Sequence, residues 1–220
     1  MSRMEHQAVF VSFEGIDGCG KSTLLSQMSG WLERAGISHL KTREPGGTPM
    51  GEAARSMLLD SSFSGMHPWT EALLYAAGRT QHVFDVILPA LREKRWVLTD
   101  RFADATLAYQ GYGRGLDVER LLDIHRWSTG DLWPDVTILL DCEVATAMER
   151  RGLRREGPDR VEQQDTAFHE RVRDGYLKLA AAEPSRFLVL DANGPLEKVA
   201  ADLHTLIRRR FDWHRGNPDL

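Results

Sequence analysis

The sequence predicts an α/β fold in which buried parallel strands alternate with helices. Two observations carry the prediction: short apolar runs that each end at an acidic residue, and stretches between them with apolar residues at helical spacing. Continuous apolar runs are typical of parallel strands buried on both faces. Strands that alternate with helices build layered domains with right-handed crossovers.

The strands are expected in this order: Val9–Phe13, a weaker run at Ser38–Thr42, then Trp96–Thr99, Val136–Leu140 and Phe187–Leu190. The carboxyl ends of parallel strands meet at one edge of the sheet, where ligands bind. We therefore expect four acids to lie near one edge, some of them facing a ligand and the others capping helices. These are Glu14, Asp100, Asp141 and Asp191.

The helices are expected between these strands. One helix starts at Leu24–Met28, and Thr48 is placed to cap another that carries Arg55 and Leu59. Two longer apolar stripes at helical spacing indicate helix faces packed on the core. They are Trp69, Leu73, Ala76, Ala77, Phe84, Ile87, Leu88 and Leu91, and Leu196, Val199, Leu203, Leu206 and Ile207.

The composition favours one globular domain over residues 1–220, with loose tails at 1–7 and 211–220. Of the 220 residues, 42% are hydrophobic and 27% are charged, which suits a full core. The net charge of −4 gives no basic field for nucleic acid or a membrane surface, so neither partner is expected.

The cysteine count and the N-terminus point to a cytoplasmic protein. Cys19 and Cys142 are too few for a disulfide framework and are expected to be reduced thiols. No apolar run approaches the roughly 20 residues that span a bilayer. The first seven residues lack a signal-peptide core.

A glycine-rich segment between the first strand and the first helix predicts a nucleoside triphosphate site. It fits Gly-x-x-x-x-Gly-Lys-Ser/Thr, the P-loop pattern, in which backbone N–H groups and a helix N-terminus bind phosphate. Its lysine adds a charge for the β- and γ-phosphates, and its serine offers a hydroxyl to Mg²⁺. The expected binding residues are Gly15, Ile16, Asp17, Gly18, Cys19, Gly20, Lys21, Ser22 and Thr23.

Asp100 and Arg101 follow the strand predicted beside the P-loop. An acid at that place holds Mg²⁺ in many P-loop proteins, and the arginine can then reach a transferring phosphoryl group. The alternative is a helix cap followed by a surface arginine.

Two further clusters suggest an acceptor site. Arg43 and Arg55 flank the turn Thr42–Thr48 and can lie beside an anionic acceptor, although the turn also suits plain strand–turn–helix chemistry. Tyr75 and Arg79 share a helix face, where a ring can stack on a base and a guanidinium can bond its edge. The alternative for this pair is a core tyrosine and a surface arginine.

The run Arg150–Arg160 has glycines and a proline among its arginines, which suggests a closing loop between two helices. Arginines on such a loop neutralise charge in phosphoryl transfer. The alternative is a run of solvated charges.

Five motifs lie at residues 13–23, 42–48, 100–102, 108–111 and 159–162. In these motifs the chain resembles the bacterial type of the thymidylate kinase family, a family of nucleoside-monophosphate kinases. The resemblance implies a P-loop NTPase fold of three layers, α/β/α, with a five-stranded parallel sheet and a short arginine-rich lid at about residues 151–160. It also implies ATP and Mg²⁺, dTMP as acceptor, dTDP as product for dTTP synthesis, and a homodimer.

The resemblance also suggests roles at the acceptor site. Tyr75 would stack on thymine and Arg79 would bond its carbonyl edge, with Thr106 and Gln110 near the base. Tyr109 would crowd the 2′ position of the sugar and disfavour ribonucleotides.

Two other residues would act at the phosphates. Asp17 would contact the sugar or phosphate side of the acceptor, and Arg101 would bridge donor and acceptor phosphates. Some family members carry a catalytic arginine in the P-loop where this chain has Gly18. The missing charge is expected from Arg151, Arg154 or Arg155, with Arg155 as first choice.

Two rival functions remain at this point. One is a kinase for another nucleotide or nucleoside, and the other is a nucleotide-binding regulator without acceptor chemistry. The absence of an Asn-Lys-x-Asp motif from the sequence counts against a GTPase switch.

Overall fold

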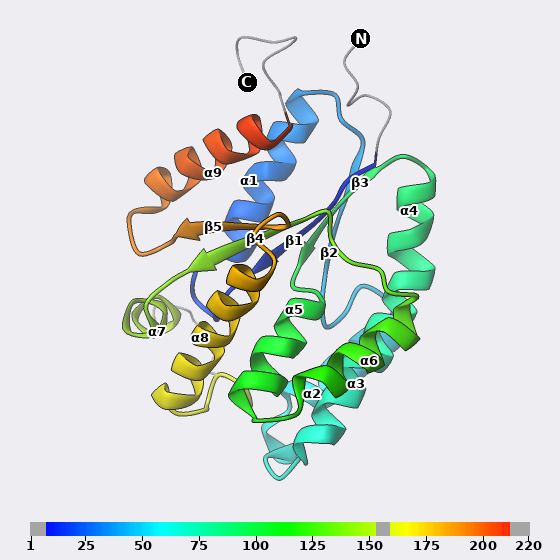
Figure 1. Ribbon diagram of the computed structural model, residues 1–220, viewed down its shortest axis with the longest axis vertical. Helices are drawn as coiled ribbons and strands as arrows, with labels where there is room; N and C mark the ends of the chain where they lie inside the picture. The colour runs from blue at the N-terminus through cyan, green and yellow to red at the C-terminus, as the bar shows by residue number, and fades with distance from the viewer. Residues whose placement is uncertain (1–7, 153–158, 212–220) are drawn as a thin grey trace.

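The computed structural model describes residues 8–152 and 159–211, and it contains a five-stranded sheet (Figure 1). The strands lie in the order β2-β3-β1-β4-β5, and every neighbouring pair is parallel. All five expected strands are confirmed: β1 (Phe10–Glu14), β2 (His39–Arg43), β3 (Trp96–Asp100), β4 (Val136–Asp141) and β5 (Phe187–Asp191).

The central strand β1 places the P-loop next to the end of β3. All five of its residues are buried, because neighbours cover both edges and both faces. Phe13 is in register with Asp100 of β3 on one side and with Ile138 of β4 on the other. The segment after β1 therefore starts beside Asp100, at the edge where parallel sheets bind ligands.

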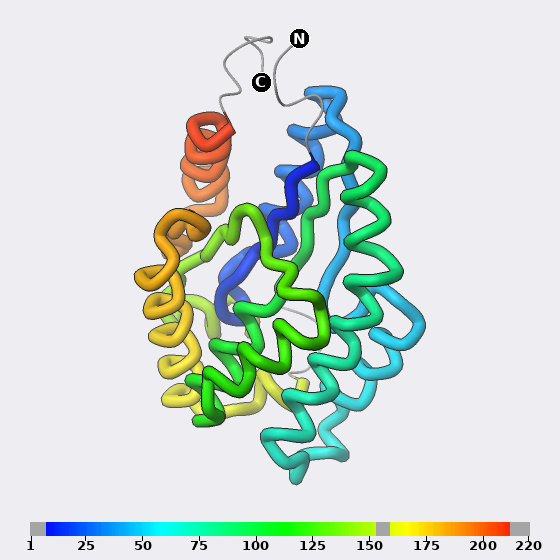
Figure 2. Tube along the Cα trace, turned by 45° about the vertical axis from the view of Figure 1, so that its right-hand side comes forward, coloured from blue at the N-terminus to red at the C-terminus, as the bar shows by residue number. Residues whose placement is uncertain are grey.

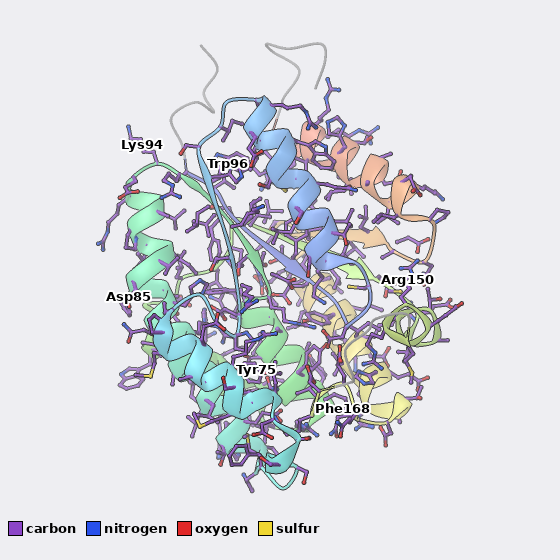
Figure 3. The ribbon with its side chains drawn as sticks, turned by 180° about the vertical axis from the view of Figure 1, so that it is seen from behind. Tyr75, Asp85, Lys94, Trp96, Arg150 and Phe168 are labelled. Atoms are coloured by element: carbon purple, nitrogen blue, oxygen red, sulfur yellow. The ribbon has the colours of Figure 1, made fainter. Side chains whose placement is uncertain are left out.

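Helices cover both faces of the sheet, as the three-layer expectation requires. Helix α1 (Lys21–Arg34) lies in front of the sheet in Figure 3, and its neighbour α9 (Leu196–Phe211) contacts β5. Helix α8 (Thr166–Ala182) packs on β4 and β5 and lies in front in Figure 1. Helix α4 (Leu88–Arg92) contacts β3.

A second group of helices lies below the sheet in Figure 2. It contains α2 (Pro49–Leu59), α3 (Pro68–His82) and α6 (Val118–Thr129), with α2 and α6 each packed on α3. Thr48 caps α2 as expected, since its Oγ1 accepts a hydrogen bond of 2.9 Å from Gly51 N. The shorter elements are Ser61–Phe63, α5 (Ala103–Thr106), the π-helical Leu107–Gly113 and α7 (Val144–Gly152).

The expected apolar stripe from Trp69 to Leu91 is only partly correct. The segment is not one helix, because a π-helical turn at Val83–Ile87 separates α3 from α4 and changes which residues share a face. Leu73 and Phe84 are 53% and 54% exposed, and Ala77 is exposed too, so these three do not face the core. The hydrophobic residues that are buried in this segment are Ala72, Ala76, Val83, Ile87 and Ala90.

The predicted start of the first helix and the predicted end of the last helix need small corrections. Helix α1 begins at Lys21, inside the P-loop, rather than at Leu24. Phe211 was expected in a tail but ends α9, with its ring centroid 4.9 Å from that of Trp96. Of the stripe expected in α9, Val199, Leu203 and Ile207 are buried, Leu206 is partly buried, and Leu196 is 40% exposed.

No helix in the described ranges 8–152 and 159–211 is both long enough and apolar enough to cross a bilayer.

Candidate active site

The P-loop connects β1 to α1 through glycines that other residues replace only with strain. Gly15, Gly18 and Gly20 have φ values of 135°, 95° and 102°, in the region that L-side chains avoid. Gly20 precedes the first turn of α1, and within the described chain no side chain caps that turn. The N–H groups of the turn are therefore available to an anion.

Two adjoining cavities open at this edge of the sheet. The P-loop cavity, of about 560 Å³, is lined by the start of α1 and by Asp100 and Arg43. The Tyr75 cavity, of about 90 Å³, is lined by Tyr75 and by residues of α5 and the following π-helical segment. Six residues line both cavities and so mark their junction: Asp17, Glu44, Arg55, Leu59, Arg101 and Asp159.

Ser22 and Asp100 form an oxygen pair in the P-loop cavity. Ser22 Oγ donates a hydrogen bond of 2.5 Å to Asp100 Oδ2. A hydroxyl and a carboxylate are oxygen ligands suited to Mg²⁺, which takes one or two protein oxygens and completes its shell with water and phosphate. The described residues contain no cluster of three or more His, Cys, Asp or Glu side chains able to hold a metal ion.

The Lys21 ammonium lies within the P-loop. Its Nζ donates hydrogen bonds of 3.1 Å to both Gly15 O and Ile16 O, and it is 3.9 Å from Asp17 Oδ1. The side chain is 6% exposed, so its charge is aimed at the cavity rather than dispersed in solvent.

Arg101 connects the P-loop to the junction of the two cavities. Its backbone has a φ of 73°, which is a strained conformation for arginine and is typical of functional sites. Its NH1 donates to Gly15 O at 3.0 Å and to Tyr176 Oη at 3.2 Å. Its NH2 donates to Asp17 Oδ1 at 2.6 Å and to Tyr109 Oη at 3.0 Å. The alternative of a surface arginine is therefore wrong.

Asp17 is a partly buried carboxylate that stays ionised. Burial acts to raise its pKa, but the charges of Arg101 and Lys21 outweigh burial and hold the pKa well below its usual range. Tyr109 Oη donates a further hydrogen bond of 2.9 Å to Asp17 Oδ2. A fixed negative charge thus stands at the cavity junction, beside two cations.

The four acids at the strand ends have different environments, and the contacts of Asp141, Asp191 and Glu14 are not the helix caps that were expected for some of them. Asp141 forms an ion pair of 2.6 Å with Arg173, and Asp191 accepts a hydrogen bond from Asn193 N at 3.0 Å. Glu14 is fully buried. Only Asp100 of the four lines the P-loop cavity.

Glu14 is linked to Arg101 through the hydroxyl of Tyr176. Its Oε1 accepts a hydrogen bond of 2.6 Å from Phe102 N, and its Oε2 accepts one of 2.8 Å from Tyr176 Oη. Burial, with a smaller effect of the Asp104 charge, raises the pKa of Glu14 to about 8. From the sequence, Glu14 was expected only as one of the four acids near the ligand-binding edge, and Tyr176 was not expected at the site.

Tyr75 and Arg79 lie on α3 but at different depths. Tyr75 is partly buried and lines the cavity named after it (Figure 3). Arg79 is 4% exposed and is not a lining residue: its Nε donates to Glu44 Oε2 at 2.8 Å and its NH2 to Thr106 Oγ1 at 2.8 Å. Thr106 does line the cavity, and Arg79 contacts it from the side that faces away from the cavity.

The other expected acceptor residues are found around the same junction. Tyr109 and Gln110 line the Tyr75 cavity. Arg55 lines both cavities and donates a hydrogen bond of 3.1 Å to Pro45 O. Arg43 lines the P-loop cavity and pairs with Glu52 at 3.0 Å.

Part of the predicted lid lies outside the described residues, namely 153–158, which includes Arg154 and Arg155. Arg151 is described: its NH1 donates a weak hydrogen bond of 3.4 Å to Glu162 O. A Cβ atom on Gly18 would lie 3.1 Å from Arg151 Cγ, so this arginine passes directly over the P-loop.

A third cavity, of about 430 Å³ and not expected from the sequence, also borders the P-loop. It is lined by Thr23, by Arg150 and by the segment after β5. The Arg150 guanidinium donates to the carbonyls of Ala192, Asn193 and Gly194 at 2.7, 3.1 and 2.9 Å, so it is fixed rather than solvated (Figure 3). The signal available was the Gly194-Pro195 turn at the carboxyl end of a strand.

Comparison with known proteins identifies relatives over nearly the whole chain. The family model described as thymidylate kinase matches residues 13–203. A thymidylate kinase of Desulfosudis oleivorans is 47% identical over 213 residues, covering 94% of this chain and 100% of that protein. Those of Geobacter sulfurreducens and Alkalilimnicola ehrlichii are 46% and 48% identical, covering 91% and 88% of this chain and 97% and 89% of theirs.

Proposed function

The chain belongs to the thymidylate kinase family and transfers a phosphoryl group from ATP to dTMP, and we propose how its residues divide that work. The product, dTDP, serves dTTP synthesis. The observation that carries the assignment of roles is the junction of two cavities at Asp17 and Arg101. A transfer reaction needs two substrates whose reacting groups meet end to end.

We propose that the P-loop cavity binds the triphosphate of ATP. Lys21 exchanges its two carbonyl partners for β- and γ-phosphate oxygens, and the N–H groups of the first turn of α1 bind the same oxygens. The third cavity, with the planar Arg150 guanidinium and the carbonyls of the segment after β5, suits the adenine ring and its amino group.

Ser22 and Asp100 would hold Mg²⁺ beside the triphosphate. Their hydroxyl and carboxylate fit that cation, and Ser22 lies at the start of the phosphate-binding helix. When bound, the ion neutralises charge on the β- and γ-phosphate oxygens.

The Tyr75 cavity is proposed to bind the base of dTMP. Tyr75 stacks on the ring, while Thr106 and Gln110 face its polar edge. Arg79 contributes through Thr106, whose hydroxyl it fixes, and its own reach to the base carbonyl stays a prediction. Tyr109, buried between this cavity and Asp17, lies where a 2′-hydroxyl would be crowded.

The acceptor phosphate then lies at the junction, where cations surround it. Arg55 and Arg101 line both cavities, and Arg43 lines the P-loop cavity. A phosphate is already ionised near neutral pH, so the reaction needs no strong general base. Alignment and charge neutralisation by Lys21, Arg101 and a lid arginine, Arg155 with Arg151, supply the catalysis.

The test of this function is an assay of ADP formation with ATP and a panel of acceptors. We expect dTMP to be preferred over dCMP and AMP by kcat/KM. Equal rates with all three acceptors would contradict the base site, and ADP formation that does not depend on any acceptor would contradict the kinase reaction.

We also propose a homodimer formed through α2, α3 and α6. These adjacent helices carry large apolar side chains on their outer surfaces: Met57, Leu73 and Trp127 are 41%, 53% and 89% exposed. Such patches mark protein interaction sites. The proposal includes a single kinase domain over the whole chain, located in the cytoplasm with its nucleotide substrates.

A further inference from the structure

Glu71, in the first turn of α3, is a buried carboxylate with three polar partners. It is 1% exposed. Its Oε1 accepts hydrogen bonds from Gln110 Nε2 at 2.8 Å and from Arg114 Nε at 3.2 Å. Its Oε2 accepts one from Arg114 NH2 at 3.1 Å and forms an ion pair of 2.7 Å with Arg160. None of these contacts involves the residues proposed to bind phosphate. Glu71 therefore has no role in the proposed phosphoryl transfer.

The contact with Glu71 determines the orientation of the Gln110 amide, that is, which of its ends carries the nitrogen and which the oxygen. An ionised carboxylate can only accept hydrogen bonds, so the amide must turn its NH₂ group toward Glu71. Gln110 is 1% exposed and lines the Tyr75 cavity. Because the nitrogen is turned to Glu71, the oxygen Oε1 lies on the other side of the amide, where it can face a molecule in that cavity as an acceptor.

Two arginines keep Glu71 ionised, which keeps it a pure acceptor. Burial acts to raise its pKa, but hydrogen bonds from Arg114 and Gln110 and the neighbouring charges lower it below the ordinary value. Arg114 is itself held, because its NH1 donates to Gln164 Oε1 at 2.7 Å and its guanidinium lies 4.7 Å from the Phe168 ring. The orientation of Gln110 is thus fixed by a rigid set of contacts.

An acceptor at this place discriminates between pyrimidines. Thymine and uracil carry a hydrogen on N3, which an amide oxygen can accept. Cytosine presents an unprotonated N3 and would place one lone pair against another. A site built to receive a particular hydrogen bond rejects analogues that cannot make it.

We propose that Glu71 is a positioning residue for base selectivity: it holds the Gln110 amide with its oxygen toward the Tyr75 cavity and so favours bases with an N3 hydrogen over cytosine. The inference rests on the proposed placement of the base in that cavity. It assigns a role in selectivity to a residue that does not touch the substrate.

The experiment measures kcat/KM for dTMP, dUMP and dCMP with wild type and Glu71→Gln. Glutamine has nearly the shape of glutamate but can both donate and accept, so the Gln110 amide can then lie either way round. We expect the dTMP-to-dCMP ratio to fall about 10-fold or more, while the dTMP-to-dUMP ratio stays unchanged, because both bases carry the N3 hydrogen. Ratios measured on one preparation are independent of its folded fraction.

Two further variants separate positioning from structural support. Arg114→Gln removes one partner of Glu71 but leaves Arg160 paired with the carboxylate, so Glu71 stays an acceptor toward Gln110 and all three kcat/KM values should fall together. Gln110→Leu removes the amide, and adding Glu71→Gln to it should change the dTMP-to-dCMP ratio no further.

The outcomes are distinguishable. A wild-type enzyme with no preference for dTMP over dCMP would overturn the base placement and this inference with it. A wild-type preference that Glu71→Gln leaves unchanged would overturn the role of Glu71 alone. An additional loss of the ratio in the double variant would show that Glu71 does not act through Gln110, and that too would overturn the inference.

Discussion

A Cβ atom on Gly18 would lie 2.2 Å from the carbonyl oxygen of Ala147 in α7. Real Cβ contacts do not come this close, so the P-loop and α7 can pack in this way only with glycine at position 18. Its φ of 95° adds the same requirement from the backbone. In this packing a catalytic arginine at position 18 has no room, which supports the proposal that an arginine of the lid supplies the charge.

Replacing Gly18 should consequently impair catalysis by displacing α7 and the arginines attached to it. We expect Gly18→Ala to lower kcat by about 10-fold or more, since displacements of about 1 Å can cost 10²-fold. Gly130→Ala is the matched control: its φ is 68°, but nothing lies within 4 Å of the added atom. The control should lose stability and keep its kcat, and an equal loss of kcat in both variants would contradict the packing argument.

A second prediction concerns Glu14 and pH. Its folded-state pKa of about 8 exceeds the ordinary value of 4.5, so the folded protein binds a proton that the unfolded chain releases between those pH values. The stability it contributes is complete below pH 4.5 and is lost as the pH rises through 8. The free energy of unfolding of wild type, relative to Glu14→Gln, should fall by up to about 1.4 kcal/mol per pH unit in that window.

Denaturant unfolding of both proteins at pH 5, 6, 7 and 8 measures this difference. Subtraction removes the opposite contribution of the buried His125, whose pKa burial lowers to about 4 and which both proteins share. Parallel curves for wild type and Glu14→Gln would contradict the buried, protonated carboxyl.

The sequence predicted the sheet well because its signal is local. The runs that form β1, β3 and β4 are short, continuous and buried in the sheet, a pattern typical of central parallel strands. The edge strands β2 and β5 are less buried, and the weaker run of β2 reflects this. The P-loop was predicted equally well, because the positive φ values at Gly15, Gly18 and Gly20 are a local backbone requirement that favours glycine.

The helical layer was predicted less well because helix rotation depends on packing between distant segments. A π-helical turn at Val83–Ile87 has no simple sequence signal, and the face that carries Leu73 and Phe84, expected in the core, is exposed. Buried polar contacts were missed for the same reason: Glu71 and Arg160 are 89 positions apart (160 − 71) and meet only in the folded chain. The burial of Arg79 next to Thr106 likewise depends on a distant residue, Glu44, which follows β2 and accepts a hydrogen bond from Arg79.

A third prediction separates the two lid arginines. Arg151 has its guanidinium against Glu162 O, whereas Arg155 is the residue that we propose to reach the transferring group. Arg155→Ala should lower kcat by about 10³-fold with a much smaller change in KM for ATP, as expected for a group that acts mainly in the transition state. Arg151→Ala should have a smaller effect on kcat.

Steady-state kinetics with saturating dTMP measures both parameters. Arg209→Ala, an exposed arginine on α9, is the control and should match wild type. A rise in KM for ATP without a change in kcat would show that Arg155 is an ordinary binding charge.

The proposed dimer face gives a fourth prediction. Trp127 is 89% exposed on α6, so a charge there costs nothing in the monomer but is buried without a partner in the dimer. We expect wild type to sediment as a dimer at micromolar concentration and Trp127→Glu to sediment as a monomer. Val189→Lys changes a side chain that is 47% exposed on β5 and should remain dimeric. Dissociation of the β5 variant alone would place the interface on the other side of the molecule.

The last prediction divides the two functions of Tyr109. Its hydroxyl donates to Asp17 at 2.9 Å and accepts from Arg101 at 3.0 Å, while its ring is the part that would crowd a 2′-hydroxyl. Tyr109→Phe should therefore lower kcat/KM for dTMP by roughly 10-fold, the effect of about one hydrogen bond to a charged group, and keep discrimination against the ribonucleotide.

Tyr109→Ala removes the ring as well, so it should accept the ribose form of the acceptor more readily relative to dTMP. The comparison is the ratio of kcat/KM for dTMP to that for its 2′-hydroxyl analogue in the three proteins. If phenylalanine already abolished the discrimination, the hydroxyl and its contact with Asp17, rather than the bulk of the ring, would determine the choice of sugar.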